Sequence, residues 1–392
     1  MASLHTSPPH ADSSLRKPDV ITVLGGGNGA FATAAHLQLL GARVRLLEAP
    51  DLAANIKGIQ ERNGIELIAE NVPGVASRFA SLELITGDPR AALDGATIVL
   101  YVVPSFCESR FTEFCASYFR PDQLIVLFCG GLGAALELAR TLRAKGMQEL
   151  PTILETEGLV YGAFKKDQTA VRVLAMKKGM HCAALPARKT DFARDWLAAY
   201  YPDFSPGADV LETGLRNLNP TIHGPISILN AGRTAPGIRW RYYWDGVSNP
   251  VGRVLEEVDK ERLAVAGVLE ISLPSAADTL IAWYGHQAAS GSQLGHILRT
   301  NPTYETVWAP ESLDHRFLTE DVPFGLVPIE ALAKLLLVRT PAITSLITLA
   351  SSLLGIDFRT CGRHLGRLGM EGMDCAQVKQ LARNGLGDKS DA

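Results

Sequence analysis

The sequence lacks paired cysteine motifs, long apolar runs and an excess of one charge. Its six cysteines are scattered over 392 residues, and no two have the Cys-x-x-Cys spacing of a redox or zinc site. We therefore expect neither a disulfide scaffold nor a metal centre. The chain has 38 Lys and Arg residues against 41 Asp and Glu residues. This balance argues against a protein that binds nucleic acid through bulk charge.

No segment has the length and composition of a membrane span. The most apolar stretch is 331–356, but Lys334, Arg339 and Pro341 interrupt it. The clean part, 342–356, has 15 residues, whereas a bilayer needs about 20. The first ten residues contain no continuous apolar run of the kind that a secretory signal requires. We expect a cytoplasmic protein with no membrane segment.

The composition instead favours a folded α/β protein. Apolar residues make up 47% and charged residues 20%, which is enough for a sizeable core. Residues 20–24 (VITVL) and 43–47 (RVRLL) predict buried strands, with a glycine-rich loop and a helix at 30–40 between them. Further strands are predicted at 97–103, 124–128 and 152–154. Strands that alternate with helical stretches indicate a doubly wound parallel sheet with helices on both faces.

The loop after the first strand has the pattern of a dinucleotide-binding turn. Gly25 would make the turn, Gly27 would let the backbone approach a pyrophosphate, and Ala30 would let the helix pack on the strand. Asn28 and Gly29 complete the loop at the helix N-terminus, where backbone N–H groups bind phosphate. An ordinary tight turn is the other interpretation, but the flanking strand and helix favour a Rossmann-type nucleotide site.

Glu48, at the end of the second strand, predicts the kind of dinucleotide. A carboxylate at this position accepts hydrogen bonds from the adenosine ribose and repels a 2′-phosphate. Arg43 and Arg45 lie nearby, but neither follows the acid. We therefore expect NAD, with NADP possible, while a solvated glutamate at a strand end is the other interpretation.

The pattern changes at the turn-rich segment 201–207. Helices are predicted after it at 252–273, 330–337 and 343–354. About 150 residues per domain also suggests two domains in a chain of this length. We divide the chain into a flexible tail at 1–18, a Rossmann domain at 19–208 and a mainly α-helical domain at 209–392.

One histidine in the second half stands in an unusual context. His223 lies in NLNPTIHGP, residues 217–225, and Pro225 suits the first position of a helix. Gly224 or His223 would then lie at the helix cap, where the positive end of the helix dipole favours a neutral imidazole. A neutral histidine can act as a general base, although a structural histidine bonded to a loop carbonyl fits the same pattern.

Five motifs occur in the order found in the opine dehydrogenases, and the chain resembles that family over about residues 20–356. The motifs are GGGNGA (25–30), NLNPTIH (217–223), YWDG (243–246), VDKERL (258–263) and RFLTEDVPFGL (316–326). The resemblance implies a Rossmann domain, a helical catalytic domain and an active site between them. It also implies NAD(P)H-dependent reductive condensation of an α-keto acid with the amino group of an amino acid.

The resemblance assigns roles to individual residues. His223 matches the catalytic histidine, and Asp321 matches the aspartate that orients and polarises it. Arg316 matches the arginine that binds a substrate carboxylate. Glu155 and Thr156 resemble the segment that contacts the substrates from the first domain. The chemistry agrees, because one imidazole backed by a carboxylate can deprotonate an amine and protonate a leaving hydroxyl, and a guanidinium binds a carboxylate with two parallel hydrogen bonds.

Other interpretations remain open at this point. Asp321 could cap a helix, and Arg316 could form a surface ion pair. The protein could instead be a dehydrogenase of a small hydroxy acid or a phosphorylated alcohol, or a non-catalytic nucleotide-binding protein. Small-molecule substrates are expected in the preferred interpretation. Which keto acid and amino acid they are, and whether the protein is a monomer or a homodimer, stays open.

Two further groups of residues receive ordinary interpretations. Lys177 and Lys178 are adjacent and are interpreted as a solvated pair. Tyr242 and Tyr243 belong to an aromatic-rich segment, 240–244, that is interpreted as packing near a domain interface. An aromatic wall for an amino-acid side chain is the alternative for that segment.

Overall fold

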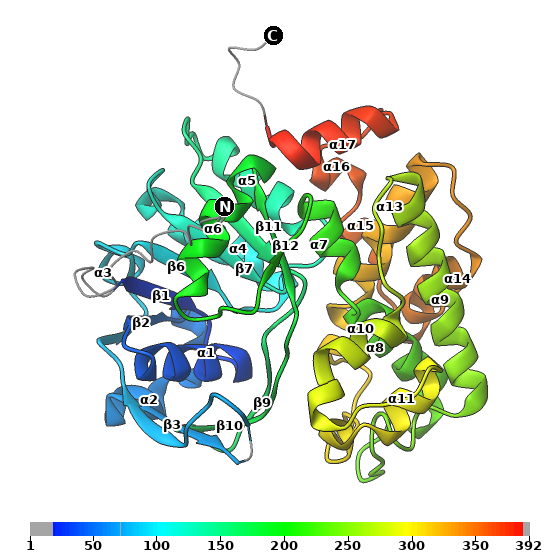
Figure 1. Cartoon of the computed structure of the whole chain (residues 1–392), viewed down its shortest axis with the longest axis horizontal. Coiled ribbons are helices and arrows are strands. Elements are labelled where there is room, and N and C mark those ends of the chain that lie inside the picture. The colour runs from blue at the N-terminus through cyan, green and yellow to red at the C-terminus, as the bar shows by residue number, and fades with distance from the viewer. Residues whose placement is uncertain (1–18, 71, 387–392) are drawn as a thin grey trace, which may run out of the picture.

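The computed structural model describes residues 19–70 and 72–386, and it shows two lobes side by side (Figure 1). The first lobe is α/β with a mostly parallel sheet, and the second is mainly α-helical. The predicted fold class is therefore confirmed. The predicted tail at 1–18 lies outside the described residues.

The first lobe is built on an eight-stranded sheet in the order β12-β11-β8-β7-β6-β1-β2-β5. All neighbours are parallel except β8 and β11, which are antiparallel. The strands are β1 (Val20–Leu24), β2 (Arg43–Leu47), β5 (Leu84–Thr86), β6 (Ile98–Tyr101), β7 (Leu124–Phe128), β8 (Thr152–Thr156), β11 (His181–Leu185) and β12 (Ser205–Pro206). Three of the five predicted strands have the expected bounds, while β6 is shorter and β8 longer than predicted.

The strands are apolar because both faces of the sheet are covered. Ile21 and Val23 of β1 are buried in one core cluster and Leu24 in another. Thr22 Oγ1 donates to the carbonyl of Ala92 in α3 (Pro89–Leu93) at 2.6 Å, so the polar residue in this strand is also paired. The other helices of this lobe are α1 (Asn28–Leu39), α2 (Lys57–Arg62), α4 (Ser105–Cys115), α5 (Ala134–Ala144) and α6 (Thr190–Ala198).

A second, four-stranded sheet was not predicted. Its order is β4-β3-β10-β9, with β3 (Gly64–Ala69), β4 (Arg78–Ser81), β9 (Tyr161–Lys165) and β10 (Ala170–Met176). Helix α1 contacts both sheets and lies between them (Figure 1). This arrangement places the end of β9 beside the glycine-rich loop at the start of α1.

The second lobe surrounds one central helix, α8 (Asn219–Leu229), which contacts α9, α12 and α14. Its other helices are α7 (Val210–Arg216), α9 (Asn249–Val268), α10 (Ala276–Tyr284), α11 (Leu294–Thr300), α12 (Arg316–Thr319), α13 (Val327–Leu335) and α14 (Pro341–Leu354). A π-helical turn at Val322–Leu326 connects α12 and α13. The predicted helices at 252–273, 330–337 and 343–354 correspond to α9, α13 and α14 with shifted ends.

The last helices return to the first lobe. They are α15 (Phe358–Cys361), α16 (Leu365–Leu368) and α17 (Cys375–Asn384), and α17 contacts α7 and β11. The buried guanidinium of Arg363 pairs with Glu108 at 2.8 Å and with Glu137 at 2.7 Å, and donates to the carbonyl of Gly130 at 3.0 Å. We propose a domain boundary near residue 208, with the C-terminal helices acting as a strap across it.

Within the described residues, no single helix is both long and apolar enough to cross a membrane, although the bent pair 341–354 and 358–368 meets that standard when taken together. The same part of the chain holds no group of three His, Cys, Asp or Glu side chains arranged for a metal ion. All six cysteines are unpaired.

Candidate active site

His223 lies inside helix α8 rather than at its cap. The helix begins at Asn219, with Pro220 in its first turn, and continues through Pro225. The expectation that Pro225 opens the helix is therefore wrong, because Pro220 takes the position where a missing N–H costs nothing. The dipole acts mainly on the first turn of a helix, so the effect on the imidazole that the sequence predicted does not apply at this position.

The imidazole of His223 contacts the carboxylate of Asp321. Nδ1 lies 2.8 Å from Oδ2, and the two side chains are 12% and 4% exposed. Asp321 precedes the π-helical turn, but its side chain makes no cap hydrogen bond, so the helix-cap interpretation does not hold. Because a carboxylate only accepts, Nδ1 carries a proton and donates it to Asp321. Nε2 is then the ring nitrogen that remains for proton exchange.

Two tyrosines and a phenylalanine surround His223. The hydroxyl of Tyr243 lies 2.9 Å from Nε2, and the hydroxyl of Tyr242 donates to the backbone carbonyl of His223 at 2.7 Å. Burial raises the pKa of Tyr243, so its phenol keeps the proton that it donates to Nε2. The ring of Phe317 lies 4.3 Å from the imidazole between centroids. Sequence reasoning took both tyrosines as packing residues, since a hydroxyl aimed at Nε2 leaves no local pattern.

Arg316 forms an ion pair with Glu320, and Glu320 is bound in turn to the first lobe. Its Nε lies 3.0 Å from Oε2 of Glu320, while the arginine side chain remains 46% exposed. Oε1 of the buried Glu320 accepts from the backbone N–H of Ser105 at 2.9 Å and from its hydroxyl at 3.3 Å. Ser105 starts helix α4 of the first lobe. Burial raises the pKa of Glu320, and Arg316 opposes that rise. The pair leaves the exposed part of the guanidinium free for a ligand.

A hollow of about 210 Å³ lies between the lobes next to Asp321. Its lining residues are Ser105, Cys129, Gly131, Asn217, Asn219, Pro220, Glu320, Asp321, Phe324 and Gly325. The side-chain amides of Asn217 and Asn219 donate to the Cys129 sulfur at 3.7 and 3.6 Å. Burial raises the pKa of the Cys129 thiol to about 12, so this group is a neutral wall of the hollow and not a nucleophile.

The glycine-rich loop fits a dinucleotide pyrophosphate. Gly25 has φ +110°, and a Cβ there would lie 2.8 Å from the carbonyl oxygen of Val102, so the turn requires glycine. A Cβ on Gly27 would meet nothing within 4 Å, which leaves open space above the start of α1. Asn28 and Gly29 begin that helix, and Ala30 is fully buried. The backbone N–H groups at the N-terminus of α1 are therefore available for phosphate oxygens.

Glu48 is buried beside this loop, with only 2% of its surface exposed. Its Oε1 accepts from the N–H of Ala49 at 2.8 Å, and its Oε2 accepts from the amide of Asn55 at 3.1 Å. Lys165, at the end of β9, donates to the carbonyls of Gly26 at 2.7 Å and Asn55 at 3.0 Å. A ribose hydroxyl would have to take the place of the Asn55 amide to reach Glu48 directly.

The structure does not bring Glu155 and Thr156 to the histidine. Glu155 is fully buried, and its carboxyl group contacts the N–H of Ala135 at 3.1 Å and the hydroxyl of Thr213 at 3.3 Å. The hydroxyl of Thr156 donates to the carbonyl of Gly158 at 3.0 Å. Both side chains are thus engaged away from the hollow, and we leave them out of the substrate site proposed below.

A Rossmann-type lobe, a helical lobe and a His–Asp pair with an exposed arginine between them define a two-domain NAD(P)-dependent dehydrogenase. Comparisons with known proteins narrow this class. Residues 206–354 match the family model described as "NAD/NADP octopine/nopaline dehydrogenase, alpha-helical domain". The chain is 36% identical over 357 residues to the opine dehydrogenase of Arthrobacter sp. (strain 1C), covering 91% of this chain and 97% of that protein.

Solved structures of similar fold agree. An octopine dehydrogenase with NADH and L-arginine has a TM-score of 0.74 at 21% identity, covering 92% of this chain and 97% of that one. A yersinopine dehydrogenase with NADP⁺ has a TM-score of 0.70 at 15% identity, covering 93% and 98%. The chain belongs to the opine dehydrogenase family, which confirms the resemblance seen in the sequence. It is an NAD(P)H-dependent oxidoreductase that condenses a keto acid reductively with the amino group of an amino acid.

Proposed function

We propose that His223, Asp321 and Arg316 carry this reaction in the present chain. The observation that supports the proposal is the 2.8 Å contact between His223 Nδ1 and Asp321 Oδ2, which joins two segments 98 residues apart in the chain. A carboxylate behind an imidazole holds one tautomer and stabilises the imidazolium that forms when Nε2 takes a proton. Nε2 is then the atom that exchanges protons with the substrates.

The condensation needs a group that first accepts a proton and later returns one. The ammonium group of the amino acid gives a proton to Nε2, and the free amine attacks the keto carbon. A proton moves from the nitrogen to the oxygen of this adduct, and the hydroxyl then leaves as water with the proton returned from Nε2, which produces the protonated imine. One imidazole can therefore serve as base and then as acid. The bound cofactor supplies the hydride that reduces the imine carbon.

Arg316 is proposed to hold the carboxylate of the keto acid. Its guanidinium is half exposed, and the segment that carries it also carries Asp321. The pair with Glu320 uses Nε, so the terminal nitrogens can face a carboxylate. Glu320 in turn contacts Ser105 of the first lobe. The guanidinium is therefore held at the junction where the substrates must meet the cofactor.

We propose that the cofactor lies on the loop Gly25–Ala30 and that NADH is preferred to NADPH. The buried carboxylate of Glu48 lies against Gly26, and a negative charge in this position disfavours a 2′-phosphate. Lys165 lies on the same side of the loop and lessens that repulsion, so use of NADPH at lower efficiency is expected. A cytoplasmic location, where both cofactors occur, is part of the same proposal.

The substrates are proposed to be an α-keto acid and an α-amino acid, as in the octopine dehydrogenase structures with pyruvate and with L-arginine. The test is an NADH-oxidation screen that crosses pyruvate, 2-oxobutanoate, oxaloacetate and 2-oxoglutarate with the common amino acids. We expect turnover only when both an amine and a keto acid are present, with a secondary amine dicarboxylate as the product detected by mass spectrometry. Reduction of a keto acid without any amine would contradict the proposal.

A further inference from the structure

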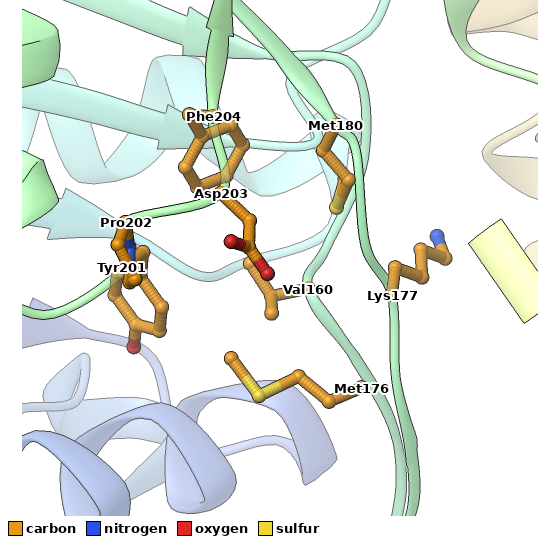
Figure 2. A pocket seen from close by; sticks show the side chains of 8 residues that line it. All are labelled: Val160, Met176, Lys177, Met180, Tyr201, Pro202, Asp203 and Phe204. Atoms are coloured by element: carbon orange, nitrogen blue, oxygen red, sulfur yellow. The ribbon is translucent and has the colours of Figure 1, made fainter. Parts of the chain in front are cut away.

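Lys177 is not the solvated residue that the sequence suggested. It follows β10, and its Nζ lies 4.3 Å from the ring centroid of Trp283, which belongs to α10 in the second lobe. The side chain is half-buried. Figure 2 shows it extending away from the other residues of an apolar hollow of about 260 Å³. The ammonium group therefore lies between the lobes, whereas the neighbouring Lys178 is exposed.

The charge of Lys177 has no carboxylate partner within 4 Å among residues 19–70 and 72–386. Glu157 interacts with Lys177 electrostatically, but its carboxylate accepts from Trp283 Nε1 at 3.0 Å and faces His181 at 3.6 Å and Arg216 at 3.9 Å. Burial lowers the pKa of Lys177. A half-buried ammonium that faces an aromatic ring and has no carboxylate within 4 Å in the described part of the chain is a suitable binding point for an anion.

An aromatic wall connects this position with the catalytic histidine. Trp283 packs against Tyr284, Tyr284 lies 5.6 Å from Tyr304, and Tyr304 stacks on Tyr243 at 4.2 Å between centroids. Tyr243 contacts Nε2 of His223. The side chain of Lys177 thus lies on the same wall as the imidazole, at its other end.

A second observation, on the thiol of Cys129, relates Lys177 to Arg316. The thiol of Cys129 borders the hollow at Asp321, and the charges of Lys177 and Arg316 each oppose the rise that burial causes in its pKa. Two cations from different lobes therefore act on one group that lines the hollow. Lys177 comes from the first lobe and Arg316 from the second.

The chemistry of the product explains why two cations are needed. Condensation of a keto acid with an amino acid gives a secondary amine that carries one carboxylate on each side of the nitrogen. If Arg316 binds the carboxylate of the keto acid, as proposed above, a second carboxylate remains without a partner. We infer that Lys177 binds the α-carboxylate of the amino acid and so selects amino acids over simple amines. This inference rests on the proposed function and adds a specificity residue to it.

The test compares Lys177→Met with the matched control Lys178→Met. Methionine keeps an apolar stem against Trp283 and removes the charge. The probes are the amino acid that the wild-type enzyme uses best and its methyl ester, which keeps the amine and side chain but loses the negative charge. For Lys177→Met, we expect the KM of the amino acid to rise about 10- to 100-fold, the usual effect of losing one charged hydrogen bond. The kcat/KM of the ester should change less than about twofold, and Lys177→Arg should restore much of the amino-acid affinity.

Three results would overturn the inference. An equal loss with the amino acid and the ester would mean that Lys177 supports the fold or the cofactor. A loss confined to aspartate and glutamate would place Lys177 on a side-chain carboxylate. If the KM of the amino acid is unchanged in Lys177→Met while the wild-type enzyme requires both substrates, Lys177 does not bind the α-carboxylate. The proposed function would then still stand. Oxidation of NADH by the wild-type protein with a keto acid and no amine would contradict both the role of Lys177 and the proposed function. NADH binding by fluorescence checks that each variant is folded.

Discussion

The side chains of His223 and Asp321 meet at 2.8 Å although 98 residues separate them in the chain. Helix α8 carries the histidine, and the segment between α12 and the π-helical turn carries the aspartate. Tyr243 completes the group by donating to the other ring nitrogen. The geometry therefore defines a directed set of hydrogen bonds, from the tyrosine hydroxyl to Nε2 and from Nδ1 to the carboxylate, and each member can be tested.

The histidine and the aspartate should act as one unit. His223→Ala should lower kcat by roughly 10²–10⁴, the usual contribution of a general acid–base catalyst. Asp321→Asn should cost less, because the imidazole remains but loses its counter-charge and its preferred tautomer. The double variant should be little worse than His223→Ala alone. Steady-state kinetics checks this, and strictly additive losses would show that the two residues work independently. NADH affinity, measured by fluorescence, should change little in all three variants.

Tyr243 should position the imidazole rather than accept its proton. Burial raises the pKa of this phenol, so a phenolate intermediate is disfavoured. Tyr243→Phe removes one neutral hydrogen bond, which corresponds to about 0.5–1.5 kcal/mol, or a roughly 2- to 10-fold loss of kcat. The matched control is Tyr284→Phe, which keeps the aromatic wall and does not touch His223. A loss as large as that of His223→Ala would instead make the tyrosine an obligatory proton carrier.

Arg316 should recognise the keto acid through the shape of its guanidinium. Arg316→Lys keeps the charge but cannot form two parallel hydrogen bonds with a carboxylate. The KM of the keto acid should rise by an amount equivalent to about 1.5–3 kcal/mol, with the KM of the amino acid nearly unchanged. Initial-rate measurements with each substrate varied in turn check this. The reverse pattern would place Arg316 on the carboxylate of the amino acid.

Glu48 should set the preference between the two cofactors. Wild-type protein should show the higher kcat/KM with NADH, and Glu48→Ala should narrow the difference by relieving repulsion of the 2′-phosphate. Because Glu48 also holds Ala49 and Asn55, Glu48→Gln is the gentler variant, and thermal unfolding separates cofactor effects from loss of stability. A higher kcat/KM with NADPH for the wild-type enzyme would contradict the proposed role of Glu48 in cofactor binding.

Glu155 should affect stability rather than substrate binding, with a defined dependence on pH. Burial raises its pKa from an ordinary 4.5 to about 8. Between these values the folded state holds a proton that the unfolded state has lost, so the free energy of unfolding falls as pH rises from about 4.5 to 8. Glu155→Gln mimics the protonated carboxyl, because an amide can still accept from Ala135 and donate to Thr213.

The glutamine variant should match the wild type near pH 5 and be more stable above pH 8, by at most about 5 kcal/mol at 1.36 kcal/mol per pKa unit. Denaturant unfolding at several pH values measures the difference. Equal stabilities at pH 9 would show that the carboxyl is ionised in the folded protein without penalty. A change in the KM of either substrate in Glu155→Gln would show that Glu155 affects substrate binding after all.

Local sequence determined the first part of the nucleotide site. Residues 20–24 form a short apolar run typical of a sheet buried on both faces, residues 43–47 contain a second strand pattern, and Gly25 stands where φ is positive. These signals act between neighbours in the chain, so β1, the loop, α1 and β2 were predicted with nearly correct bounds. The order of five motifs along the chain was likewise enough to identify the family.

Tertiary structure alone decided which side chains meet. The sequence predicted that Pro225 starts the helix around His223, whereas α8 in the packed second lobe begins at Asn219 with Pro220 in its first turn. Nothing local distinguishes a buried Glu155 from an accessible one at the end of a strand. The same holds for Lys177, whose sequence neighbour is a solvated lysine but whose spatial neighbour is Trp283, 106 residues away by number (283 − 177). Contacts between distant segments depend on how helices and sheets pack as bodies, and a short stretch of sequence does not carry that information.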